Sequence, residues 1–215
     1  MLAERRESLR TGRDRRGAPL DDEQRGVVAN EIADLEGAIA QWQHLRVVPS
    51  SVTFDDVLHV SLGRRRVDVM HLGRGNTAGD AVVYVPDAKT LMTGDLVVYP
   101  TPYAFGSYLG EWTGTLRKLM AIDAATIVPG HGPVQHDFEY VKLVASALDS
   151  VTRQVRAAVQ EGLSLDETRA RVDLTPLRAR FAGASLDRAR AFHDAFEKPA
   201  VERAYEEAKG KLSDE

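Results

Sequence analysis

Three short stretches of the sequence place a polar side chain beside glycine directly after a strand-like run. They read GRGNTAGD at residues 73–80, MTGDLVV at 92–98 and IVPGHGPV at 127–134, and their polar residues are Asn76 with Thr77, Asp95 and His131. Carboxylate and imidazole groups are good ligands for zinc or iron. A single Gly-Asp or loop histidine is typical of an ordinary turn. Three such stretches in this order indicate a metal site, because strand ends that feed tight glycine turns hold side chains rigidly.

The runs around these stretches predict a β-rich centre. Between residues 52 and 134 the sequence has short β-branched runs separated by Gly, Pro and Asp, namely VTFDDVLHV, RRVDVMH, AVVYVP, TLM and TIVP. SLGRR and PDAKT are typical of turns between strands, so we expect consecutive hairpins. We therefore divide the chain into a helical arm (1–48), a β-rich core (49–136) and a C-terminal helical region (137–215).

Helices are predicted on both sides of this centre. Residues 22–45, 110–123 and 137–160 carry apolar side chains at spacings of three and four, which is the pattern of a helix with one buried face. SLDE at 164–167 has the form of a capping box that begins another helix. Pro199 is expected to break or kink the last helix near Lys198, because proline lacks the backbone donor that a helix needs.

Composition narrows the class of protein. The chain has 215 residues, 43% of them hydrophobic, so it has enough apolar residues for a sizeable core. A net charge of -4 gives no basic field for nucleic acid. No run reaches the roughly 18 apolar residues of a membrane span, and no signal peptide opens the sequence. The chain has no cysteine, which excludes thiolate nucleophiles and cysteine zinc sites. We expect a cytoplasmic protein that binds neither nucleic acid nor membrane.

The stretch from Val67 to Val134 resembles the C-terminal half of a metallo-β-lactamase-fold hydrolase. The matching text is HLGRGNTAGDAVVYVPDAKTLMTGDLVV followed by VPGHGPV. The resemblance implies an α/β chain with a partial αββα fold, central hairpins flanked by helices, and helical extensions at both ends. It also implies that Asp95 is a carboxylate bridging two metals, that His131 is a metal ligand, and that Asn76 stands where the family carries a histidine ligand. The implied metal is zinc, with iron or manganese as alternatives.

Two departures from the family pattern concern the metal ligands. An amide oxygen binds zinc more weakly than an imidazole nitrogen, so Asn76 should leave one metal position weakened or empty. The family's main ligand cluster, His-x-His-x-Asp-His, is absent, and His44, His59 and His71 are not spaced to chelate together. Metal occupancy is therefore expected to be incomplete. Met1 resembles an internal position of a longer parent, and the other interpretation is a diverged protein that functions at this length.

The resemblance implies hydrolysis by metal-bound hydroxide, so no side chain is assigned as a catalytic nucleophile. In an intact parent the substrate would be a small molecule with an ester, thioester, lactone or lactam-like bond. Whether this chain alone is an enzyme stays open, and we expect weak or no activity from it. Aromatic residues follow Asp95 closely in YPTPYAFGSYLGEW, and they either line a substrate pocket or pack beneath the site: Tyr99, Tyr103, Phe105, Tyr108 and Trp112.

The alternative from another class is a non-catalytic interaction or oligomerisation module. If the chain holds mainly the second half of the fold, apolar strand faces such as those of AVVYVP and TIVP lack their cover. We then expect a homodimer. The competing outcome is that the helices at 22–45 and 137–160 fold back over this surface.

Overall fold

The computed structural model describes residues 2–14, 17–42 and 45–212, and it divides into two compact units, residues 1–53 and 54–215. We describe each unit by itself. His44 lies outside the described residues.

The first unit is a pair of helices, α1 (Leu2–Thr11) and α2 (Asp22–Trp42), joined by ion pairs such as Arg5–Glu31 at 2.8 Å. The predicted helix is present, but its apolar stripe is only partly covered. Val28 is buried, whereas Ile39 and Trp42 are 37% and 64% exposed. The reason is length, because a helix of 10 residues spans about half of one with 21.

The second unit contains a five-stranded sheet in the order β1-β2-β3-β4-β5. Its strands are β1 (Val57–Leu62), β2 (Arg65–Met70), β3 (Val82–Val85), β4 (Thr90–Val98) and β5 (Thr126–His131). The first four are antiparallel neighbours, which confirms the predicted hairpins, and a short 3-10 turn, η1 (Pro86–Ala88), joins β3 to β4. The first strand starts later than expected, at Val57. β5 pairs parallel to β4, and the crossover between them contains α3 (Leu109–Met120).

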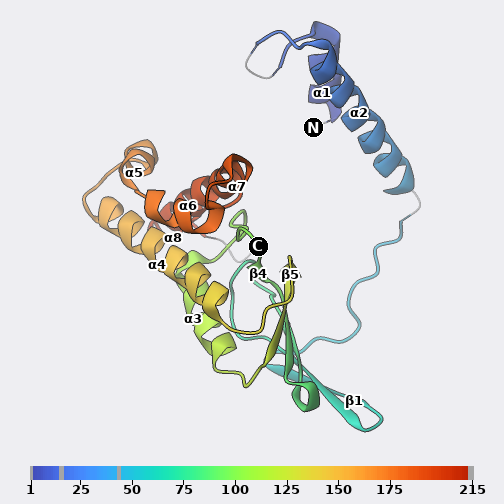
Figure 1. The fold of residues 1–215 in the computed structure, drawn as a ribbon, viewed down its shortest axis with the longest axis vertical. Coiled ribbons are helices and arrows are strands. Elements are labelled where there is room, and N and C mark those ends of the chain that lie inside the picture. The colour runs from blue at the N-terminus through green and yellow to red at the C-terminus, as the bar shows by residue number, and fades with distance from the viewer. Residues whose placement is uncertain (1, 15–16, 43–44, 213–215) are drawn as a thin grey trace. The chain divides into compact units, whose positions relative to one another are not determined.

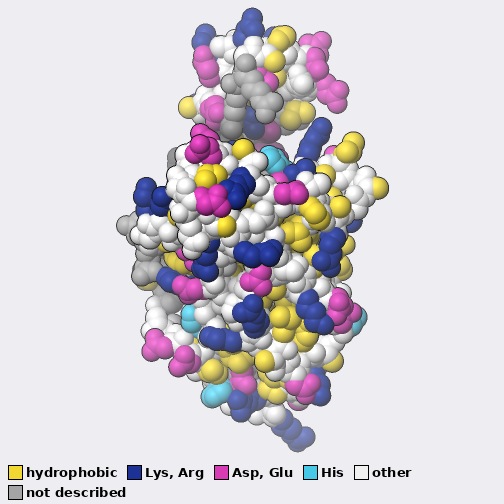
Figure 2. Space-filling model, turned by 90° about the vertical axis from the view of Figure 1, so that its left-hand side faces the viewer, with side chains coloured by type: hydrophobic (Ala, Val, Ile, Leu, Met, Phe, Trp, Pro, Cys, Tyr) yellow, Lys and Arg dark blue, Asp and Glu magenta, His cyan; other side chains and the backbone are white. Residues whose placement is uncertain are grey.

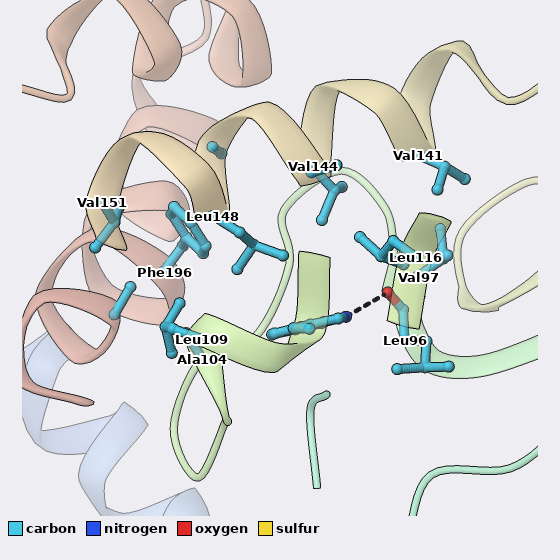
Figure 3. Packing of buried hydrophobic residues seen from close by; sticks show 14 of the residues in the cluster. Leu96, Val97, Ala104, Leu109, Leu116, Val141, Val144, Leu148, Val151 and Phe196 are labelled. Atoms are coloured by element: carbon cyan, nitrogen blue, oxygen red, sulfur yellow. Dashed lines mark hydrogen bonds between the residues drawn. The ribbon is translucent and has the colours of Figure 1, made fainter. Parts of the chain in front are cut away.

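Helices α3 and α4 (Glu139–Gln160) lie on one side of the sheet (Figure 1). The apolar stripe predicted for α4 is fully buried: Val141, Val144, Leu148, Val151 and Val155. Trp112 of α3 is fully buried, and its indole N–H donates to the backbone oxygen of Leu96 at 3.3 Å, the dashed bond in Figure 3. The helix pair therefore fixes where the second half of β4 lies.

Short helices complete the second unit: α5 (Leu165–Arg171), α6 (Thr175–Ala182), α7 (Leu186–Phe192), a π-helical turn η2 (His193–Glu197) and α8 (Lys198–Ala208). The capping box is confirmed at Ser164 and Glu167. The break expected at Pro199 takes the form of the π-turn, which runs directly into α8. Phe196 and Ala200 belong to the same buried cluster as Leu96, so the C-terminal helices share one core with the sheet.

The two faces of the sheet differ in cover. On the helix side, the row Tyr84–Leu91–Ile127 includes two fully buried residues. The adjacent row crosses all five strands on the other face, is apolar throughout and is only partly covered: Leu58, Val69, Val83, Met92 and Val128. No helix in the described ranges is long and apolar enough to cross a bilayer.

Candidate metal site

Asp95 and His131 lie side by side on the parallel strands β4 and β5. The distance from Asp95 Oδ1 to His131 Nε2 is 3.7 Å, and the side chains are 40% and 56% exposed. Parallel strands end at the same edge of a sheet, which is why residues 36 positions apart meet here. Within the described chain neither side chain makes a hydrogen bond, so the Asp95 oxygens and His131 Nε2 are available at the surface to bind a metal ion.

Two glycines of VPGHGPV make this approach possible. A Cβ on Gly130 would lie 2.1 Å from Asp95 Oδ1 and 2.8 Å from the carbonyl carbon of Gly94. Gly132 has a φ of +100°, and a Cβ there would lie 2.7 Å from Cβ of Tyr99. Any side chain at these positions would push the strands apart. The glycines around His131 therefore let the chain pass close enough to Asp95 for the two ligand-type groups to meet.

The GRGNTAGD loop reaches the same strand through Gly75. A Cβ on Gly75 would lie 2.4 Å from Cδ2 of Leu96, the residue after Asp95. Asn76 follows directly and is half-buried. The three stretches singled out by sequence thus lie next to one another, although no hydrogen bond in the described chain joins Asn76 to Asp95 or His131.

Side chains of helix α3 donate hydrogen bonds to backbone oxygens at the start of this loop. Thr115 Oγ1 donates to the oxygen of Arg74 at 2.7 Å, and Lys118 Nζ donates to that of Leu72 at 2.7 Å. Arg74 also pairs with Glu111, with a second contact from Nε at 3.1 Å, and this guanidinium lowers the pKa of the Glu111 carboxyl. Sequence reasoning missed these contacts. The available signal was the polar pair Thr115 and Lys118, which lie one helical turn apart on α3.

Thr77 and Asp80 shape the far half of the loop. Asp80 accepts hydrogen bonds from the Thr77 backbone N–H at 3.0 Å and from its hydroxyl at 2.7 Å. His71 Nδ1 lies 2.8 Å from the backbone oxygen of Asp80. These residues hold the turn in shape, and His59 is similarly engaged with Asp68 at 2.6 Å on the outer strands.

The aromatic residues that follow Asp95 divide into two groups. Tyr103 lies against His131 with ring centroids 5.6 Å apart, Phe105 lies 6.1 Å from Tyr103, and Tyr99 packs edge-on against Tyr140 while its N–H donates to the His131 oxygen at 3.0 Å. Tyr108 and Trp112 are 3% and 0% exposed. For these two residues the structure supports packing beneath the site and not a pocket wall, because both rings are enclosed by the core.

A bound zinc ion would find two ligands here and not a closed site. Donor atoms on one tetrahedral zinc lie about 3.3 Å apart, since each sits about 2.0–2.1 Å from the metal. The 3.7 Å separation of Asp95 and His131 is close to this value. However, no group of three or more His, Cys, Asp or Glu among the described residues is arranged to hold a metal. The residues therefore fit two positions of a site that needs further ligands.

A separate cleft lies between α3 and α4. It measures about 760 Å³ and is lined by side chains of those helices, among them Thr113, Asp149, Arg153 and Arg156. The face of the molecule around α4 carries Lys and Arg interspersed with Asp and Glu (Figure 2). Because the cleft is separate from Asp95 and His131, we treat these two residues as an open surface site.

Comparison with known proteins defines the class. The model of the metallo-beta-lactamase superfamily matches residues 10–131, more than half of the chain, so the chain belongs to this superfamily. No curated protein sequence matched the chain.

Solved structures of a sec-alkylsulfatase support the fold. The sec-alkylsulfatase Pisa1 from Pseudomonas sp. is 13% identical with a TM-score of 0.58, over 75% of this chain and 27% of that one. A metallo-beta-lactamase from Pontibacter korlensis is 23% identical with a TM-score of 0.44, over 67% of this chain and 76% of that one. For the metallo-beta-lactamase DIM-1 the values are 19% and 0.43, over 53% and 54%. The chain thus spans about half the length of DIM-1 and about a quarter of Pisa1.

Proposed function

We propose that this chain carries part of a metal-dependent hydrolase site, with Asp95 and His131 as two ligands and Asn76 at a weakened third position. The observation that carries the proposal is the 3.7 Å distance between Asp95 and His131, an approach that glycine at position 130 makes possible. Neither side chain has a hydrogen-bond partner in the described chain. Membership of the superfamily supports a hydrolase in the broad sense.

The sequence lacks the His-x-His-x-Asp-His cluster, so we propose that other polypeptide supplies the remaining ligands. Zinc is the proposed metal, with iron or manganese as alternatives that Asp and His ligands also suit. When bound, such an ion lowers the pKa of a bound water and polarises a carbonyl. The proposed substrate is a small molecule with an ester, thioester, lactone or lactam-like bond, and the absence of cysteine is compatible with action in the cytoplasm.

Zinc-dependent hydrolysis tests this proposal. We would assay the chain with excess zinc against one ester, one thioester, one lactone and one β-lactam. Any zinc-dependent turnover should be low, and it should disappear in Asp95→Asn and His131→Gln while persisting in His136→Gln, a matched change at an exposed neighbouring histidine. Turnover that survives loss of Asp95 and His131 would contradict the proposal.

A second candidate function is an interaction module, and the half-exposed apolar row on the open face of the sheet favours it. This row extends over all five strands from Leu58 to Val128. Burying such surface is worth roughly 25 cal/mol per Å², so a second copy of the chain is a suitable cover. Sedimentation should then show a dimer at micromolar concentration, weakened by Met92→Lys at the centre of the row. A monomer that binds no hydrophobic dye would contradict this candidate.

A further inference from the structure

The aromatic loop, residues 99–108, is fastened to the C-terminal helices. Arg203 of α8 donates from Nε to the backbone oxygen of Ser107 at 3.3 Å and from Nη2 to that of Gly106 at 3.4 Å. Its Nη1 pairs with Glu206 at 3.0 Å, and the Arg203 side chain is only 23% exposed. The guanidinium is therefore held in one orientation and presents its remaining donors to the loop.

A second attachment comes from the π-turn. The backbone N–H of Ala104 donates to the oxygen of Ala195 at 3.0 Å. In a regular helix this oxygen would accept from residue 199, but Pro199 has no N–H, so the oxygen is left for another donor. Ala104 is itself fully buried in the cluster that contains Phe196 (Figure 3). The proline that disturbs the helix thus provides an acceptor for the loop.

These attachments bracket Phe105. The backbone is fixed at Ala104 on one side and at Gly106 on the other, yet the Phe105 side chain is 65% exposed. Its ring lies 6.1 Å from that of Tyr103, which lies 5.6 Å from the ring of His131. The three rings form a continuous series from a proposed metal ligand to solvent. Phe105 therefore presents an apolar ring to solvent from a backbone that is held on both sides.

We propose that Tyr103 and Phe105 form an apolar wall that selects substrates with an aryl or alkyl group next to the bond that is hydrolysed. Arg203 is the positioning residue of this wall, and the oxygen of Ala195 is its second support. The wall begins at His131. When the reacting group of the substrate lies at Asp95 and His131, its apolar substituent therefore lies along the rings of Tyr103 and Phe105. The inference rests on the proposed function for the place of the reacting group, and it names the substrate class.

Hydrogen exchange at the Ala104 amide tests whether Arg203 holds the aromatic loop in place. In Arg203→Ala this amide should exchange about tenfold faster, since hydrogen bonds from a charged donor are lost. Amides in α3 such as Leu116 should not change. The control is Arg169→Ala, which removes an ion pair between Arg169 and Glu202 of α8 but no contact with the loop. Unchanged exchange at Ala104 would overturn the role of Arg203.

A second variant keeps the test decisive if Arg203→Ala loosens the whole unit. Pro199→Ala supplies a backbone N–H that competes for the Ala195 oxygen, and alanine favours the helix. Faster exchange at Ala104 with unchanged or slower exchange in α3 supports the inference. No change at Ala104 in this variant overturns the role of Ala195.

Substrate selection is tested with two probes, phenylacetate and acetate, which both carry a carboxylate. Their binding to the metal-free protein is measured by NMR chemical shifts. Phenylacetate should bind about two- to tenfold more tightly, as expected for one aromatic contact, and should shift the signals of Tyr103 and Phe105. The preference should vanish in Phe105→Ala and persist in Trp42→Ala, a comparably exposed aromatic residue in the first unit. Equal binding of the two probes, or a preference that survives Phe105→Ala, overturns the inference. Because no metal is present, this result is separate from a failure of the metal site.

Discussion

Gly130→Ala probes the contact that brings the two proposed ligands together. The new Cβ would lie 2.1 Å from Asp95 Oδ1 and 2.8 Å from the carbonyl carbon of Gly94, whereas ordinary contacts begin at 3.4 Å. The Asp95 carboxylate would have to move by about 1.3 Å (3.4 − 2.1) and the β4 backbone by about 0.6 Å (3.4 − 2.8). Backbone atoms cannot rotate away as a flexible side chain does. The strain therefore falls on the pairing of β4 with β5 at the site.

Overpacking of this kind costs about 1–3 kcal/mol. For a unit of this size each kcal/mol lowers Tm by about 2–4 °C, so Gly130→Ala should lower it by about 2–12 °C. Zinc affinity should fall as well, because the separation of Asp95 and His131 changes. The matched control is Gly114→Ala in α3, where a Cβ meets nothing within 4 Å. That change should stabilise the protein by about 0.5–1 kcal/mol and leave zinc binding unaltered. Calorimetry and zinc titration that show Gly130→Ala to be indistinguishable from wild type would refute the reasoning.

Three further predictions concern the metal and the loop beside it. Elemental analysis after gel filtration should find less than one zinc per chain, because zinc sites normally need three or four protein ligands; two tightly held ions would contradict this. In a form of the protein supplied with the missing ligands, Asn76→His should raise metal affinity at the first position, since imidazole is the better donor; a titration showing no change would mean that Asn76 has another role. Glu111→Gln should lower Tm at neutral pH by removing the Arg74 pair. Because the folded pKa of Glu111 is lowered, this stabilisation is present above the ordinary glutamate pKa and is lost as pH falls below about 4, so the Tm difference between variant and wild type should shrink there. A difference that stays constant from pH 7 to pH 3 would show that the ion pair is not its source.

Local patterns predicted the elements well because their signals lie within a few residues. The hairpins, the buried stripe of α4 and the capping box at Ser164 depend on neighbouring side chains and turn residues, and each is confirmed. The stripe of α2 was the exception, since its pattern carries no information on how much partner surface is available. Trp42 continues the same apolar periodicity, yet it is exposed to solvent.

The site could be predicted only in outline. Sequence pointed to Asp95 and His131, and the structure places them together, but the reason lies in contacts between distant segments. Gly130 has to be glycine because of Asp95, and Thr115 on α3 holds the backbone of Arg74. Pro199 was interpreted as a local interruption, whereas its effect is to leave the Ala195 oxygen for Ala104. Such relations depend on tertiary approach, which no local spacing encodes.

The central claim is that Asp95 and His131 act together as metal ligands, and a zinc titration followed through the histidine side-chain NMR signals tests it most directly. Zinc should shift the imidazole signals of His131 first, and Asp95→Asn should abolish or greatly weaken that response. His136, exposed and five residues away, serves as the internal control and should respond little. A His131 signal that ignores zinc, or that responds equally well without the Asp95 carboxylate, would contradict the account.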